Sequence, residues 1–459
     1  MRVRFHEARD VFFQKVSEAL VQGLFPTGQV VVIRDIWGRL SLALEDAPPE
    51  KAGDLTLAEM EKSLQAATGP YYGGEALLKA DMFAPDLVFG SPDLRRCREH
   101  DRLYFLERVV VGADWQRSPL PDEHPKVPRA TLHGIKGGVG RSTTLMAWAR
   151  HLAERGEQVL VIDLDLESPG VSSGLMPPNA GADYGVVDWL VEDAVGNADE
   201  DLLRGMAAKS PLGEGTSGSI KLVPCGGRQE GKELEYLAKL SRVYQDLGPR
   251  EQDGKPPRSM QFADRLAYLI DELERAHEPT VVLIDSRAGI HDLAAITITR
   301  LRATAFLFLI GTQQTYDGYR LLFSQWQGTA VGEEVRKRLQ VVASQVPKLG
   351  RDEFLKQFQL DSWNLFADTL YDPQNSEDSS KTPTPFHFDL RNPAGPHSPL
   401  ITLWSDAVQQ WSPIGAPDSI GASDKSYNLP SDVKTPLLNF LERATELVFT
   451  PPERDDESP

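Results

Sequence analysis

The stretch HGIKGGVGRSTT, residues 133–144, joins an apolar segment, ATLHGI, to a segment of helical period that begins near Ser142. A glycine-rich turn between a strand and a helix lets backbone N–H groups approach phosphate oxygens, and the helix N-terminus adds its positive dipole end. Ser142 supplies a hydroxyl suited to Mg²⁺, and Lys136 and Arg141 supply two cations. The stretch therefore predicts a nucleotide-phosphate loop rather than a turn that merely ends a strand.

The sequence around this loop repeats a strand-then-helix pattern. After ATLHGI come the apolar runs QVLVIDLDL, TVVLIDS, TAFLFLI and LQVVASQV, each tied to a stretch of helical period. Strands that alternate with helices favour a parallel sheet covered on both faces. We therefore expect an α/β fold with a doubly wound, mostly parallel sheet.

The chain divides into two predicted domains. Residues 1–124 combine helical periods with short strands and predict a smaller α+β accessory domain, which ends in the proline-rich linker QRSPLPDEHPKVP. Residues 125–450 predict the phosphate-loop domain. Within it, residues 205–258 are rich in glycine, proline and charge and look like an insertion, and the acidic residues 451–459 are expected to be a disordered tail.

Composition indicates an ordinary soluble protein. Of 459 residues, 41% are hydrophobic and 25% are charged. The beginning of the chain has no continuous apolar segment of the signal-peptide type, and no run approaches the length of a membrane span, so we expect a cytoplasmic protein. Cys97 and Cys225 form no CxxC pair; we expect buried thiols rather than a disulfide framework or a zinc site.

The charge balance argues against nucleic acid as a partner. The formal net charge is -18, which repels phosphate backbones at long range. Two basic clusters, Arg300 with Arg302 and residues 336–338, lie beside apolar positions at helical spacing. We interpret them as solvated helix faces.

The loop sequence KGGVGRSTT resembles the deviant phosphate loop KGGVGKTT of the ParA/MinD ATPases, in the SIMIBI class of P-loop NTPases. Ile135 stands where the general loop has its first glycine, a change that ParA-type loops tolerate. The resemblance implies that Lys136 reaches across an ATP-dependent homodimer to the partner's phosphates, and that Ser142 binds Mg²⁺. It places the nucleotide against Gly137, Gly138, Val139, Gly140, Arg141, Ser142 and Thr143, with Thr143 at the α-phosphate.

Arg141 is the main departure from that family. It matches the family's invariant loop lysine. Arginine stays charged and can bind two phosphate oxygens at once, but its guanidinium is larger and its fork fixes the direction of its hydrogen bonds. We expect nucleotide binding to survive and hydrolysis to be slow, because the compact lysine charge normally follows the γ-phosphate into the transition state.

Two acidic segments extend the resemblance. QVLVIDLDLESPG resembles the family's VVIDxD segment, which implies that Asp165 orients or activates the attacking water and that Asp163 supports the Mg²⁺ shell. These carboxylates could instead cap the next helix. TVVLIDSRAGIHD resembles the MinD segment DSPAGIE, so Asp285 would be the Walker B acid that holds Mg²⁺ through water, and Gly289 would sense the γ-phosphate by its backbone.

Four nearby residues keep two interpretations each. Arg287 replaces the family's proline and either stabilises transferred charge or forms a structural ion pair. His291 either faces the site or is a satisfied surface histidine, and we favour the latter. Gln313 and Gln314 follow the strand TAFLFLI and are either ligand contacts at a strand edge or solvated loop residues.

The remaining motifs separate possible functions. No NKxD or TKxD follows LQVVASQV, so ATP is preferred over a guanine nucleotide. The amphipathic TPLLNFLERATELVF is followed by PPERDDESP, which is acidic and helix-breaking, so we expect no membrane anchor. We expect a slow, Mg²⁺-dependent ATPase, a dimerisation switch that acts on a protein partner through residues 1–124. The alternative is a nucleotide-locked scaffold in a multi-protein signalling or defence system; Asp165 favours the ATPase and Arg141 the scaffold.

Overall fold

The chain is described by a computed structural model that covers residues 3–91, 93–97, 100–109, 111–117, 125–177, 180–228, 233–252, 255–373, 385–414 and 427–450. It forms two compact units, Met1–Ala113 and Asp114–Pro459. The predicted acidic tail at 451–459 and most of the predicted linker lie outside the described residues.

The first unit is a small α+β fold built on a five-stranded sheet of order β3-β2-β1-β5-β4. Strands β1 and β2 form an antiparallel pair around Gly38, whose φ of 84° is in the left-handed region, and β5 joins β1 in parallel. Helices α1 and α2 pack on one face of this sheet, where Phe12 and Leu64 are fully buried. The elements are α1 Phe5–Val21, β1 Val30–Arg34, β2 Leu40–Leu44, α2 Leu57–Thr68, β3 Leu77–Leu78, α3 Asp86–Phe89, β4 Arg95–Arg96 and β5 Leu103–Glu107.

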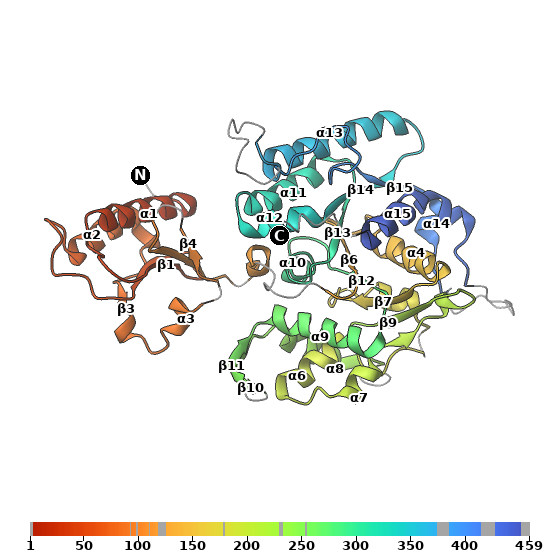
Figure 1. The fold of residues 1–459 in the computed structure, drawn as a ribbon, viewed down its shortest axis with the longest axis horizontal. Coiled ribbons are helices and arrows are strands. Elements are labelled where there is room, and N and C mark those ends of the chain that lie inside the picture. The colour runs from red at the N-terminus through yellow and green to blue at the C-terminus, as the bar shows by residue number, and fades with distance from the viewer. Residues whose placement is uncertain are drawn as a thin grey trace, which may run out of the picture. The chain divides into compact units, whose positions relative to one another are not determined.

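The second unit is built on an eight-stranded sheet of order β15-β14-β13-β6-β12-β7-β9-β8, parallel except for β8 (Figure 1). Its strands are β6 Arg129–His133, β7 Gln158–Asp163, β8 Ala208–Lys209, β9 Ser219–Val223, β12 Val281–Asp285, β13 Thr304–Leu309, β14 Leu339–Val346 and β15 Leu400–Leu403, and a separate hairpin pairs β10 Leu247–Gln252 with β11 Lys255–Met260. Its helices are α4 Arg141–Glu154, α5 Val171–Leu175, α6 Val186–Val195, α7 Glu200–Gly205, α8 Glu233–Val243, α9 Phe262–His277, α10 Asp292–Thr299, α11 Gln313–Trp326, α12 Ala330–Val335, α13 Arg351–Thr369, α14 Asp406–Gln410 and α15 Ser431–Phe449.

Helices cover both faces of the large sheet. Successive residues of β12 alternate between them: Val281 and Leu283 pack with α4 and α15, whereas Val282 and Ile284 pack with α6 and α9. Helices α11 and α13 cover the β13–β14 half of the second face. Because both faces are buried, the strands read as continuous apolar runs, and the predicted doubly wound α/β fold is confirmed (Figure 1).

The amphipathic segment near the end of the chain forms helix α15. It contains TPLLNFLERATELVF, and its buried side chains include Leu437, Phe440 and Leu441. Phe440 lies edge-on against Trp148 of α4 and Phe306 of β13, at ring-centroid distances of 5.5 and 5.4 Å. Burying each such side chain contributes about 1.5–3 kcal/mol, so the apolar face of α15 belongs to the core of the unit. Among the described residues, no helix is long and apolar enough to cross a membrane.

The sheet also contains strands that the sequence did not predict. The segment 205–258 was expected to be an insertion, yet β9 pairs in parallel with β7 and carries β8 beyond it. The strand β15 was also missed; it is only four residues long and pairs with β14 at the other edge of the sheet. The same segment contains helix α8.

Candidate nucleotide-binding site

The predicted phosphate loop connects β6 to α4 at the carboxyl edge of the sheet. Gly138 and Gly140 have φ values of 74° and 84°, a conformation that favours glycine. A Cβ on Gly137, Gly138 or Gly140 would meet no atom within 4 Å, so packing does not require these glycines, and Gly138 and Gly140 are favoured by their backbone conformation. Gly140 is the N-cap of α4, and the positive end of that 14-residue helix therefore faces the loop.

Two polar residues of β14 hold this loop from behind. Gln345 Nε2 donates to the carbonyl of Gly138 at 2.8 Å, and Ser344 Oγ donates to the carbonyl of Val139. Val139 itself is buried in the core beneath the loop. These contacts fix the loop to a strand that lies about 200 positions further along the chain. The only indication of them in the sequence is that two polar residues stand at the end of an apolar strand.

The metal-binding residues predicted from the two phosphate-site motifs lie together. Ser142 Oγ donates to Asp285 Oδ2 at 2.8 Å, and Asp285 is almost completely buried at the end of β12. Its other oxygen, Oδ1, is buried and has no hydrogen-bond partner among the described residues. Burial and the charge of Asp163 raise the pKa of Asp285 to about 7, against the opposing charge of Arg141. An unsatisfied carboxylate oxygen beside a serine hydroxyl fits a Mg²⁺ ion, which prefers such oxygen ligands.

Asp165 resembles Asp285 in its unsatisfied carboxylate. Its Oδ1 is buried without a partner among the described residues, and burial together with the charge of Asp163 raises its pKa. Asp163 is different: Oδ1 accepts from the amide of Asp165 at 3.2 Å, and Oδ2 accepts from the amide and hydroxyl of Ser172 at 2.9 and 2.6 Å. Asp163 thus holds the loop that leads to α5. Its bonds to Ser172, in the first turn of α5, correspond to the alternative in which these carboxylates cap the next helix.

Arg141 is buried at the base of the site. It is 7% exposed, and its Nη1 donates to the carbonyl of Ser286 at 2.7 Å. Thr143, in the same first turn of α4, is half-buried. His133, which the sequence reasoning did not single out, is fully buried, and burial together with the Arg141 charge lowers its pKa to about 3. A neutral histidine therefore lies close to the arginine that replaces the family's lysine.

Lys136 is half-buried and contacts the start of α11. Its Nζ donates to Oε1 of Gln314, so of the two glutamines left open by the sequence, the structure brings Gln314 to the loop. Gln313 instead donates to Asp317 at 2.8 Å within α11. Ile135, in place of the general loop's first glycine, packs on α11; a Cβ on Gly318 would lie 2.6 Å from the Ile135 side chain.

A cluster of polar side chains joins the two acidic segments. Arg287 Nη1 lies 2.6 Å from Glu167 Oε2, and the hydroxyl of Tyr244 donates to Glu167 Oε1. The hydroxyl of Tyr236, on α8, donates to the carbonyl of Leu166 at 2.6 Å. The ion-pair interpretation of Arg287 is therefore the one seen in the structure. Glu167 and the two tyrosines were missed, because nothing in their local sequence indicates such a contact.

His291 and Gly289 also have partners within the protein. His291 Nδ1 accepts from the amide of Leu293 at 3.3 Å and caps α10, and its ring lies edge-on to Tyr244 at 5.9 Å. Gly289 has a φ of 85°, and its amide donates to the carbonyl of Gly134 at 2.9 Å. In this state the amide of Gly289 is used to hold the start of the phosphate loop.

The two basic clusters are engaged in contacts within the second unit. Arg300 pairs with Asp264, and Arg336 binds the carboxylate of Asp372 at 2.7 and 3.0 Å. Arg338 donates to two backbone carbonyls at 3.0 Å each. These side chains are not the freely solvated faces expected from the sequence. Of the two cysteines, Cys225 is buried as expected and Cys97 is half-buried.

Comparison with known proteins agrees with this geometry. Residues 131–347 match the family model of the CobQ/CobB/MinD/ParA nucleotide binding domain. The match runs from β6 to the end of β14 and so includes the phosphate loop, Asp165, Asp285 and the β14 residues that hold the loop. It supports a nucleotide-binding domain of the ParA/MinD type in the second unit. No curated protein is similar in sequence to the chain.

Several solved structures are similar to the chain. A protein from Borrelia burgdorferi B31 named for plasmid partition and bound to AMPPNP has 13% identity and a TM-score of 0.40, over 70% of this chain and 99% of that one. Cobyrinic acid a,c-diamide synthase from Mycobacterium smegmatis, with an ATP analogue and magnesium, has 17% identity and a TM-score of 0.30, over 43% and 67%. The pNOB8 ParA bound to nonspecific DNA has 18% identity and a TM-score of 0.33, over 53% and 75%.

Proposed function

We propose that the second unit binds ATP with Mg²⁺ and hydrolyses it slowly, as a ParA/MinD-like switch that dimerises on the nucleotide. The observation that carries this proposal is the 2.8 Å contact between Ser142 and Asp285, with an unsatisfied carboxylate oxygen at the N-terminal end of α4. A glycine loop, a helix N-terminus, a hydroxyl and a buried acid at one strand edge are the parts that phosphate and Mg²⁺ binding require.

Phosphate binding in this proposal uses the loop backbone and two cations. The amides of Gly137, Gly138, Val139 and Gly140 and the start of α4 surround the phosphates, and Thr143 contacts the α-phosphate. Arg141 binds the β- and γ-phosphate oxygens of its own subunit. Its hydrogen bond to Ser286 orients the guanidinium, and its charge offsets the buried Asp285 and Asp165.

Metal binding uses the hydroxyl of Ser142 directly and Asp285 through water. Bound Mg²⁺ would neutralise charge that develops on the phosphates. Asp163 contributes negative charge to the metal site while its oxygens hold the loop that carries Asp165. Asp165, whose Oδ1 has no hydrogen-bond partner among the described residues, orients and activates the attacking water. Gly289 senses the γ-phosphate by its amide, which would first leave the carbonyl of Gly134.

Dimerisation depends on Lys136 in this proposal. In the single subunit Lys136 is half-buried, and its one side-chain hydrogen-bond partner among the described residues is Gln314. A cation on the phosphate loop with a single exchangeable partner is placed to reach the phosphates of a second subunit. Gln314 would then be a temporary partner that Lys136 leaves when ATP brings two subunits together.

A second function, a nucleotide-locked scaffold with little turnover, is favoured by Arg141. The guanidinium is buried and bonded to the protein, so it is less free than a lysine to follow the moving phosphoryl group. Single-turnover ATP hydrolysis separates the two functions. The ATPase requires measurable turnover in the wild type that falls in Asp165→Ala; the scaffold requires ATP binding with no turnover in either protein.

The first unit is proposed to bind the protein partner on which the switch acts. It has its own core, and its exposed apolar side chains include Trp37, Phe83 and Leu87. Large apolar side chains on a surface are typical of contacts with other proteins when they cluster. A pull-down with residues 1–113 as bait and with Trp37→Ser and Phe83→Ser as controls tests this assignment.

A further inference from the structure

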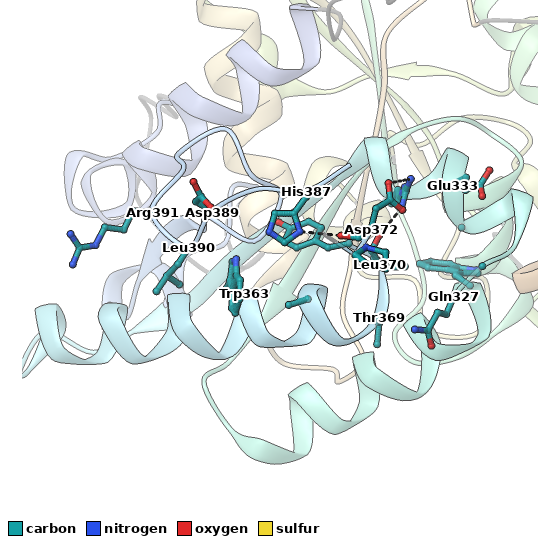
Figure 2. A pocket seen from close by; sticks show the side chains of 17 residues that line it. Gln327, Glu333, Trp363, Thr369, Leu370, Asp372, His387, Asp389, Leu390 and Arg391 are labelled. Atoms are coloured by element: carbon teal, nitrogen blue, oxygen red, sulfur yellow. Dashed lines mark hydrogen bonds and ion pairs between the residues drawn. The ribbon is translucent and has the colours of Figure 1, made fainter. Parts of the chain in front are cut away.

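A cavity of about 1050 Å³ lies in the second unit, away from the nucleotide site. It is formed by the ends of α11 and α13, by α12, and by residues 387–391 (Figure 2). Arg336, in its lining, precedes β14, whereas Ser344 and Gln345 at the far end of β14 hold the phosphate loop. At about 3.3 Å per residue this strand separates the two sites by on the order of 25 Å.

The middle of the cavity is aromatic. Trp363 of α13 donates its indole N–H to the carbonyl of Phe388 at 2.9 Å, so the ring is fixed while remaining partly exposed. His387 contacts the carbonyl of Asp372 through Nδ1 at 3.2 Å. Trp326 and Tyr371 complete the aromatic lining. A wall of oriented rings favours apolar, planar or cationic groups.

The charges of the lining favour a cation. Arg336 is neutralised by Asp372 at 2.7 and 3.0 Å. The carboxylates of Glu333 and Asp389 are exposed, and no hydrogen bond or ion pair involves them among the described residues. In Figure 2 Glu333 lies at the right of the view and Asp389 on the other side of His387, near Trp363, while the side chain of Arg391 extends away from the other labelled residues.

Two helix C-termini add to this preference. Helix α11 ends at Trp326 and α13 ends at Thr369, and both residues line the cavity. The C-terminal end of a helix carries a partial negative charge, which attracts cations. The carbonyl of Trp326 already accepts from Thr329 and that of Leu370 from Arg336, so the helix ends add less negative potential than the carboxylates do.

We propose that this cavity binds an elongated organic cation, with a cationic group at each end and an apolar middle. Glu333 and Asp389 bind the two ends, and Trp363 and His387 contact the middle. A free polyamine has this chemistry, and so does a protein segment with two basic side chains around an apolar one. The site does not depend on nucleotide binding at the phosphate loop.

Calorimetric titration of the full chain tests the proposal with two probes, spermidine and a capped Lys-Leu-Leu-Lys peptide, at low ionic strength. We expect at least one probe to bind, and Glu333→Gln with Asp389→Asn to weaken it tenfold or more. Asp352→Asn with Glu353→Gln, at the other end of α13, is the matched control and should change the affinity less than twofold. Preference for spermidine indicates a free small cation, and preference for the peptide indicates side chains of a protein.

Two results would overturn the proposal. One is that neither probe binds at millimolar concentration. The other is that the Glu333→Gln, Asp389→Asn protein binds as tightly as the wild type. Trp363→Phe gives an independent check, since an occupant of the cavity should change the fluorescence of the wild type and change that of this variant less, the remaining tryptophan of the lining being the buried Trp326. Unaltered fluorescence on saturation of the wild type would likewise place the probe elsewhere.

Discussion

The guanidinium of Arg287 lies 2.6 Å from the carboxylate of Glu167 and so joins the segment after Asp285 to the segment after Asp165. Tyr244 donates to the same carboxylate, which ties both segments to the region after α8. Among the residues that the structure describes, Asp285 and Asp165 are the two acids with unsatisfied buried oxygens. The ion pair therefore fixes the distance between the proposed metal acid and the proposed water-orienting acid.

The first prediction concerns this ion pair. Glu167→Gln should slow single-turnover ATP hydrolysis about 3- to 10-fold, equivalent to about 0.7–1.4 kcal/mol, because the loop that carries Asp165 is less well fixed. Arg287→Gln should have a similar effect, and the double variant should be no slower than either one. ATP affinity should stay within about twofold. Additive losses in the double variant would show that the two side chains act separately.

The second prediction concerns Lys136. Lys136→Ala should prevent ATP-dependent dimerisation, measured by light scattering, while calorimetry shows nearly unchanged ATP affinity of the monomer, because in the single subunit the Lys136 ammonium is bound to Gln314 of α11. Lys356→Ala, on the exposed surface of α13, is the matched control and should dimerise normally. An identical mass with and without ATP and Mg²⁺ in the wild type would contradict the dimer itself.

Some strands of the large sheet could be predicted from the sequence and others could not. The strands β6, β7, β12, β13 and β14 were predictable because burial on both faces makes them continuous apolar runs. Strand β9 was missed because SIKLV, whose alternation of polar and apolar residues is a strand pattern, is only five residues long and lies in a glycine-rich segment. Strand β15 was missed because four residues carry little periodicity.

In the candidate site, too, some residues could be predicted from the sequence and others could not. The phosphate loop and Asp285 were predictable because their chemistry is written in short local motifs. The contact of Ser344 with Val139 and that of Glu167 with Tyr244 were not, since each depends on which distant segment the fold brings to the loop. For Asp163 the motif predicted the position in the sequence at the end of a strand. Its bonds to Ser172 could be seen only in the structure.

The third prediction concerns where the second unit begins. Trp115 is 3% exposed in its core, and the carbonyl of Trp115 accepts from Trp326 Nε1 at 2.7 Å. A fragment of residues 114–450 should therefore fold and bind ATP alone. A fragment of residues 125–450 should be less stable by about 3–5 kcal/mol, the usual cost of removing a buried tryptophan. Equal urea midpoints for the two fragments would show that Trp115 contributes little.

The fourth prediction concerns His133, whose pKa is lowered to about 3 by burial and by the charge of Arg141. Between pH 6.5 and 3 the unfolded chain binds a proton at this residue and the folded chain does not, so stability is lost as the pH falls through that range. The loss from one such group is about 1.4 kcal/mol per pH unit below its normal pKa. His133→Leu should flatten the curve of unfolding free energy against pH by this amount between pH 6 and 4. Parallel curves would mean that His133 is protonated in the folded protein.

The fifth prediction concerns Arg141, the cation that replaces the usual lysine. If its guanidinium binds the β- and γ-phosphates, its loss should cost about 2–3 kcal/mol, or roughly 30- to 150-fold in ATP affinity. We therefore expect Arg141→Ala to bind ATP much more weakly. Arg141→Met, which keeps the apolar stem in its buried position, should bind as weakly while remaining folded, as judged by thermal unfolding.

Arg141→Lys separates binding from turnover. Lysine keeps the charge, so calorimetry should give an ATP affinity close to that of the wild type. It lacks the fork that holds the carbonyl of Ser286 at 2.7 Å, so it is freer to follow the γ-phosphate, and hydrolysis should be as fast as in the wild type or faster. If Arg141→Met binds ATP as tightly as the wild type, the guanidinium serves Ser286 alone, and the phosphates are held by the loop backbone and Lys136.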